Sequence, residues 1–105
     1  MQQLQGILEE CVRRLEDHYG DVLAGVVLYG SVARGEAEDE SDIDLLVLLS
    51  SDFDRWQEIQ AIGDVLFPVQ MKCDRYISAK PVAEADYREG RLAFLRRAKA
   101  EGVSL

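Results

Sequence analysis

Two apolar runs separated by the polar residues 30–42 constrain this chain of 105 residues more than any other feature. The first run ends before Gly30-Ser31, and the second starts with Asp42 and Asp44 and continues to Leu49. Short apolar runs rich in branched side chains predict buried β-strands. Because side chains alternate between the two faces of a strand and each residue advances about 3.3 Å, we expect Asp42 and Asp44 on one face, with Cα atoms roughly 6.6 Å apart.

This aspartate pair predicts a site for a hard cation. Both carboxylates should be ionised at neutral pH unless burial without a metal raises their pKa values. Mg²⁺ would offset the repulsion between them, and it suits one or two carboxylates combined with substrate phosphates. Gly30 allows a sharp turn and close approach to a ligand, and Ser31 could cap a short helix whose N–H groups face an anion. The alternative is a strand-entry turn carrying surface acids, which the neighbouring Gly30-Ser31 makes less favourable.

The residues GSVARG, followed after five residues by SDIDLLV, resemble the signature of a known family. It is the minimal nucleotidyltransferase (MNT) branch of the DNA polymerase β-like nucleotidyltransferase superfamily. The diagnostic residues occupy only Gly30 to Asp44. The resemblance implies an α/β (α+β) fold with a small mixed sheet of about three strands flanked by helices, and one minimal domain over residues 1–105.

The same resemblance implies the chemistry. A nucleoside monophosphate, AMP from ATP, would pass to an acceptor hydroxyl with the help of two Mg²⁺ ions held by three carboxylates. The phosphates would lie on Gly30 and Ser31, and the metal ions on Asp42 and Asp44. Arg34 lies one turn after Ser31, and two roles remain open for it. It could lie near the triphosphate or fix the loop, or it could form an ion pair with a surface acid.

The third carboxylate is the point where the chain departs from the family. The family places it on the strand after the second long helix. We predict this strand over Tyr76–Val82, where Ser78 or Lys80 occupies the required face. Neither side chain replaces an acid. Asp74 is the candidate if that strand begins earlier, with Glu84 as a weaker one, so the predicted catalytic set is Asp42, Asp44 and Asp74.

Many MNT proteins act as antitoxins beside a helical HEPN (higher eukaryotes and prokaryotes nucleotide-binding) toxin and adenylylate one of its tyrosines. The resemblance therefore implies ATP or another NTP as substrate and a HEPN-type toxin as partner. The alternative is an antitoxin module that binds nucleotide or protein but has lost turnover. Ser78 and Lys80 favour this alternative, whereas the intact GSVARG and SDID stretches oppose it.

Composition and charge limit the partners and the cellular location that we expect for this protein. A net charge of −8 argues against general nucleic-acid binding, because phosphate backbones select basic surfaces. No apolar run approaches the roughly 20 residues of a membrane span, and the polar N-terminus does not resemble a signal peptide, so we expect no membrane association and a cytoplasmic location. Cys11 and Cys73 are expected to be reduced, buried thiols.

Apolar spacing predicts the helices. One amphipathic helix covers Gln2 to Tyr19, and a second follows residues 50–52 with Trp56 in its core stripe. From Glu84 the chain reads as helical again, with an interruption near Gly90 and a basic face that hints at a homo-oligomer. A run of acids predicts a solvated loop; it consists of Glu36, Glu38, Asp39 and Glu40.

Overall fold

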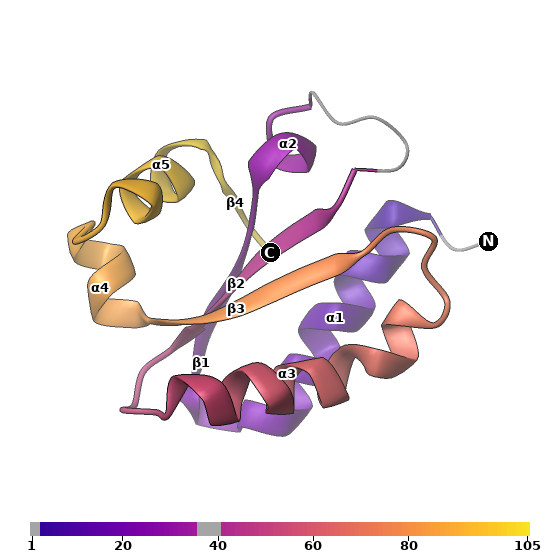
Figure 1. Ribbon diagram of the computed structural model, residues 1–105, viewed down its shortest axis with the longest axis horizontal. Helices are drawn as coiled ribbons and strands as arrows, with labels where there is room; N and C mark the ends of the chain where they lie inside the picture. Colours follow the sequence, from indigo (N-terminus) through magenta and orange to yellow (C-terminus); the bar gives the residue numbers. More distant parts are fainter. Residues whose placement is uncertain (1–2, 36–40) are drawn as a thin grey trace.

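In the computed structural model, which describes residues 3–35 and 41–105, four strands form one mixed sheet with helices on both faces (Figure 1). The elements in chain order are α1 (Leu4–Tyr19), a 3₁₀ turn (Gly20–Val22), β1 (Leu23–Tyr29), α2 (Gly30–Ala33), β2 (Ile43–Leu49), α3 (Arg55–Gln70), β3 (Ile77–Ala83), α4 (Glu84–Glu89), α5 (Ala93–Glu101) and β4 (Val103–Ser104). The strand order is β3-β2-β1-β4, with β1 antiparallel to both neighbours and β2 parallel to β3. The predicted α/β fold with a small mixed sheet is confirmed.

One face of the sheet carries the larger apolar core. Alternate residues of β2, from Ile43 to Leu49, pack there against the inward stripes of α1 and α3. Figure 1 shows these two helices side by side along that face. The fully buried side chains of this layer include Leu15, Ile43, Leu45, Leu49, Ile62 and Val69.

The other face is covered by α4 and α5, over a smaller core. Leu46 and Leu48 of β2 pack there with Val82, Leu95 and Ala98. Side chains alternate between the two faces of a strand, so Asp42 and Asp44 lie on the same face as Leu46 and Leu48. On this face, the two acids precede the two leucines along the chain. The acid pair therefore lies on the less covered side of the sheet, beyond the end of its apolar core.

The short strand β4 is the part of the sheet that the sequence did not predict. Gly102 ends α5, and Val103 and Ser104 then pair with Leu28 and Val27, while the Leu105 N–H donates to the Val26 carbonyl oxygen. A strand of two residues has no periodicity from which it could be recognised. It is formed because the antiparallel edge of β1 is available where α5 ends.

The prediction that Trp56 belongs to the core is wrong. Its side chain is 76 % exposed, whereas Ile62, Leu66 and Val69 of the same helix are buried. Trp56 lies in the first turn of α3 and, at about 100° per residue, sits roughly 120° around the helix from Ile62, so it lies off the buried stripe. Among the helices of the described residues, none is long and apolar enough to cross a membrane.

A buried carboxylate ties α1 to the end of α3. Glu10 is 4 % exposed and accepts hydrogen bonds from Arg14 Nε and Lys72 Nζ, both at 2.9 Å. These two cations lower the pKa of Glu10 from 4.5 to about 2, against the opposing effect of burial. Lys72 follows α3 directly, so this pairing holds the two helices of the larger core together.

Glu10→Gln is therefore expected to lower the urea midpoint of unfolding at pH 7. Because the folded pKa lies below the unfolded one, the contribution of Glu10 is complete above pH 4.5 and is lost as the pH falls toward about 2. The difference in midpoint between wild type and variant should thus shrink at pH 3. Glu9→Gln, at the exposed neighbouring position, is the control. A difference that stayed constant with pH would contradict this role of Glu10.

The two cysteines are free, as predicted, but only Cys11 is buried; Cys73, which follows α3, is partly exposed, so the prediction that it is buried is wrong. Cys11 is buried in the core of α1, and burial raises the pKa of its thiol to about 12. It is therefore a packing residue rather than a reactive one.

Candidate active site

The two halves of the motif meet because β1 and β2 are antiparallel. Their register pairs Tyr29, the last residue of β1, with Asp44 near the start of β2. Gly30 therefore emerges beside the strand end that carries Asp42 and Asp44. The glycine-serine corner and the aspartate pair lie together, as the sequence predicted from their separation.

Gly30 touches Asp44 directly. It has φ +78°, in the left-handed region, and a Cβ built on it would overlap the carboxylate of Asp44. A larger residue would be strained by its backbone and would also displace the acid. Glycine at this position thus allows the chain to turn within contact distance of the carboxylate.

The short helix α2 begins two residues earlier than a cap at Ser31 would place it. Tyr29, not Ser31, is the residue before its first turn, and no side chain caps it. The prediction that Ser31 caps this helix is therefore wrong. Ser31 instead lies inside the first turn, next to Gly30, with a partly exposed side chain.

Asp44 is the electrostatically strained member of the pair. Burial raises its pKa above the usual value, Asp42 raises it further by charge repulsion, and Lys80 opposes both. Asp42 itself is exposed, just before β2. The two acids therefore present concentrated negative charge that a cation would relieve.

No acid stands beside this pair on the neighbouring strand. In the parallel β2–β3 register Ser78 is the partner of Asp44, and Lys80 follows two residues later on the same face. Within residues 3–35 and 41–105, no three His, Cys, Asp or Glu side chains gather as a metal site. The register that places Ser78 and Lys80 on the face of the acids is the one predicted from the sequence.

The two candidates for a third carboxylate lie elsewhere along β3. Asp74 is exposed in the turn before the strand, and the structure does not bring it into a three-acid group with Asp42 and Asp44. Glu84 opens α4 at the opposite end of β3, which puts it about 20 Å along the strand from Ser78. A catalytic role for Asp74 stays a prediction.

Arg34 pairs with an acid of the last long helix. Its Nη1 lies 3.4 Å from Glu101 Oε2 of α5, so the ion-pair alternative for this residue is present, although with a partner far away in the sequence. Both residues line a hollow of about 210 Å³ between α2 and α5 that reaches Gly30. The acid run at residues 36–40 lies outside the described part of the chain.

This hollow contains residues that sequence reasoning missed. Its lining adds Tyr29, Phe94 and Arg97 to Gly30 and Arg34. The ring of Phe94 is 46 % exposed, and Arg97 makes no ion pair with any residue that the structure describes. No local pattern could have assigned Arg97 to this site, since α5 reaches α2 only through the tertiary fold.

The nucleotidyltransferase domain family matches residues 8–97, which include the glycine-serine corner, the aspartate pair and all of the hollow except Ala98 and Glu101. The chain belongs to this family. Its confirmed sheet, and the motif halves joined across β1 and β2, are those of a nucleotidyltransferase domain.

Individual relatives share stretches of different length with this nucleotidyltransferase domain. "Putative protein adenylyltransferase MJ1305" of Methanocaldococcus jannaschii is 44% identical over 45 residues, covering 43% of this chain and 31% of the relative. "Putative protein adenylyltransferase MJ0141" of the same organism is 33% identical over 72 residues, covering 69% of this chain and 72% of the relative. The chain thus spans about a third of the first relative and about three quarters of the second.

A solved structure described as "Crystal structure of the toxin-antitoxin with AMP-PNP" has the same fold. It superimposes with a TM-score of 0.55 at 20% sequence identity, covering 91% of this chain and 70% of the other. At this identity the likeness concerns the fold alone.

The donor atoms of the nucleotidyltransferase site fit one divalent cation. Asp42 and Asp44 supply carboxylate oxygens, the ligands that Mg²⁺ prefers, and Gly30 brings the backbone turn into contact with Asp44. Three protein carboxylates, the set expected for two ions, are not assembled in the described residues.

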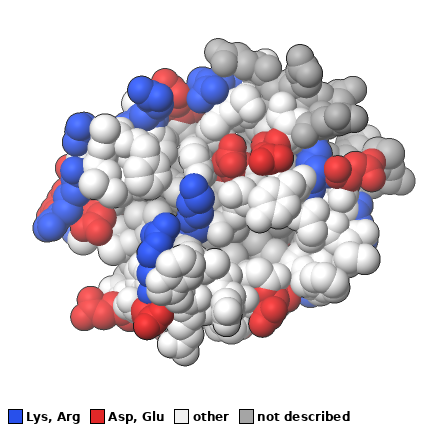
Figure 2. Space-filling view, in the orientation of Figure 1, with Lys and Arg blue, Asp and Glu red and all other residues white. Residues whose placement is uncertain are grey.

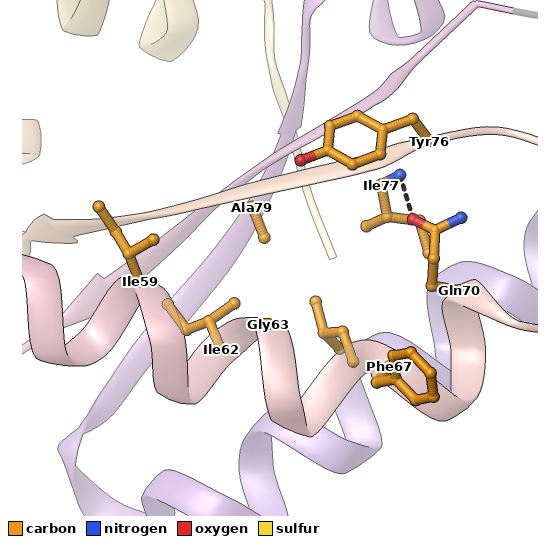
Figure 3. Close-up of a pocket in the computed structure, with 9 residues that line it drawn as sticks. Ile59, Ile62, Gly63, Phe67, Gln70, Tyr76, Ile77 and Ala79 are labelled. Atoms are coloured by element: carbon orange, nitrogen blue, oxygen red, sulfur yellow. Dashed lines mark hydrogen bonds between the residues drawn. The ribbon is translucent and has the colours of Figure 1, made fainter.

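A second hollow, of about 200 Å³, lies between α3 and the edge strand β3, away from the acids (Figure 3). It is apolar, and Ile77 and Ala79 reach it from the face of the sheet opposite Ser78. At its rim Gln70 Oε1 accepts the outward N–H of Ile77 at 2.8 Å, and Pro81 has no N–H to offer. The edge of β3 is thus poorly suited to adding another strand.

Basic side chains are dispersed rather than gathered. Figure 2 shows Lys and Arg interspersed with acidic and neutral side chains on the face in view. Much of the basic terminal face is engaged internally: Arg88 pairs with Glu84, Arg91 with Asp86 and Glu89, Arg96 donates to the Gly90 carbonyl, and Lys99 donates to the Arg88 carbonyl. Self-association through this face stays a prediction.

Proposed function

We propose that this nucleotidyltransferase domain, over residues 1–105, transfers AMP from ATP to a hydroxyl group of a partner protein. The observation that carries the proposal is the contact of Gly30 with Asp44. It places a backbone corner open to phosphates against the acid pair that would hold their cation. In this proposal Gly30 and Ser31 bind the phosphates.

The reaction is a substitution at the α-phosphorus. The oxygen of the acceptor hydroxyl bonds to it, the bond to the oxygen that bridges to the β-phosphate breaks, and pyrophosphate leaves with the bond electrons. The hydroxyl proton passes to solvent. Catalysis of this kind depends on positioning and on neutralising charge.

Asp42 and Asp44 would hold Mg²⁺ in this reaction. When bound there, the ion would supply positive charge to neutralise the triphosphate and the leaving pyrophosphate. Burial and Asp42 raise the pKa of Asp44, so the ionised form of this acid is costly without a cation. That cost supports a metal-binding role for the pair.

The hollow beside Gly30 extends the nucleotide site toward α5. Arg97, which has no ion pair among the described residues, and the exposed ring of Phe94 offer a cation and a stacking surface. Arg34 is held at the same hollow by Glu101. This lining supports a role for the hollow in taking part of the nucleotide.

The names of two relatives, protein adenylyltransferases, support a protein acceptor. The toxin–antitoxin complex with the same fold supports an antitoxin role. We infer that the acceptor is a tyrosine of a HEPN-type toxin and that the reaction takes place in the cytoplasm, where ATP is available.

The test is transfer of label from α-³²P-ATP. The protein is incubated with Mg²⁺, labelled ATP and a partner protein that co-purifies with it, and the products are separated by denaturing electrophoresis. Label on the partner that survives denaturation, and is absent when γ-³²P-ATP is used, is the expected result. A partner that remains unlabelled while ATP binds would contradict transfer and support the second candidate.

That second candidate is a nucleotide-binding antitoxin without turnover. It is favoured by one observation, that Ser78 and not an acid is the register partner of Asp44. It predicts ATP binding that strengthens association with the partner, but no covalent label.

A further inference from the structure

Among the residues that the structure describes, the strands beside β2 place no acid next to Asp44 on its face of the sheet. Across β1 its partner is Tyr29, and across β3 its partner is Ser78. The next residue along this face of β3 is Lys80. Two hydroxyl-bearing residues and one lysine thus surround the acid within the sheet.

Lys80 is free to act on this site. It is exposed, and its ammonium group makes no ion pair with any described residue. On β3 it lies two residues after Ser78, the register partner of Asp44, so its side chain leaves the sheet on the face that carries Asp44. The lysine is thus directed by the strand toward the acid pair.

A second divalent ion would be poorly accommodated here. It would need a further carboxylate on the β3 side, where the face carries Ser78, and it would be repelled by the ammonium of Lys80 at close range. A lysine, however, supplies a compact positive charge that binds phosphate oxygens well. The lysine can thus provide part of the charge that a second ion would bring.

The geometry points to a site that binds one divalent cation with the nucleotide, at Asp42 and Asp44, and in which Lys80 contributes the remaining positive charge by contacting the triphosphate. This inference rests on the proposed nucleotidyltransferase function. It assigns Lys80 as a nucleotide-binding residue and replaces the expected pair of ions with one ion and one ammonium group.

The test counts metal ions rather than products. Mn²⁺ binding is measured by electron paramagnetic resonance in the presence of a non-hydrolysable ATP analogue in excess over protein, with the analogue alone subtracted, and analogue affinity is measured by calorimetry. The wild-type protein is expected to hold one Mn²⁺ per chain. Lys80→Gln should still hold one, but should bind the analogue at least about tenfold more weakly.

Two further variants sharpen the test. Lys99→Gln removes an exposed lysine of α5 and should leave both the ion count and the analogue affinity unchanged. The double variant Ser78→Asp with Lys80→Gln places a carboxylate in register with Asp44 and removes the ammonium, so it should hold two Mn²⁺. Circular dichroism and urea unfolding establish that each variant is folded before its ions are counted.

Each result decides something specific. Two ions in the wild type, or unchanged analogue affinity in Lys80→Gln, would overturn the inference and leave the proposed function standing. A folded double variant that still holds one ion would overturn the assignment of Ser78 and Lys80 as the residues that exclude a second. If neither Mn²⁺ nor the analogue bound to the wild type, the proposed function itself would fall.

Discussion

Replacing Asp44 by asparagine is expected to lower the rate of AMP transfer by about 10³-fold, the order found when a charge-stabilising group is removed from an active site. Asp44 is the acid that touches Gly30, so it lies where cation and phosphates meet. The assay is the transfer of α-³²P label to the partner.

The same substitution should not destabilise the protein, and this makes it diagnostic. Because the folded pKa of Asp44 is raised, its ionised form costs stability above the unfolded pKa, and neutral asparagine removes that cost at pH 7. The urea midpoint of Asp44→Asn should therefore equal or exceed that of wild type.

Asp64→Asn, at an exposed position of α3, is the matched control and should change neither the rate of AMP transfer nor the urea midpoint of unfolding. Activity retained by folded Asp44→Asn would refute the assigned role.

Gly30→Ala should show the largest loss of stability among substitutions at the site, about 2–4 kcal/mol, together with loss of nucleotide binding. Two costs combine at this position. An alanine at φ +78° is strained, and its Cβ would overlap the Asp44 carboxylate. Urea unfolding and calorimetry with an ATP analogue measure the two effects.

The control for Gly30→Ala is Gly20→Ala. Gly20 also has positive φ, +56°, but a Cβ there would meet nothing within 4 Å. Its substitution should cost only about 1 kcal/mol and leave nucleotide binding intact. Equal effects of the two substitutions would show that the contact with Asp44 contributes nothing.

The elements that could be predicted are those with a local signal. The apolar stripes of α1 and α3 and the runs of β1 and β2 are periodic, and they formed helices and strands close to the expected residues. Trp56 shows the limit of this reasoning, because an apolar residue near helical spacing can still lie off the buried stripe and be exposed. β4 shows another, since its two residues pair only because β1 has an open edge.

Part of the candidate site could also be predicted from the sequence. The spacing of Gly30-Ser31 and Asp42 with Asp44, read as two strands, was enough to predict that the two pairs meet. The absence of an acid opposite Asp44 could also be read from the alternation of Ser78 and Lys80 in β3.

The sequence by itself therefore determined the family, the sheet and the acid pair, because each depends on residues close together in the chain or on a short period. Only the tertiary structure decided that Gly30 contacts Asp44 and that α5 brings Phe94 and Arg97 to α2. It also joined Arg34 to Glu101. Contacts of this kind depend on how separate elements pack, and no local pattern encodes the distance between them.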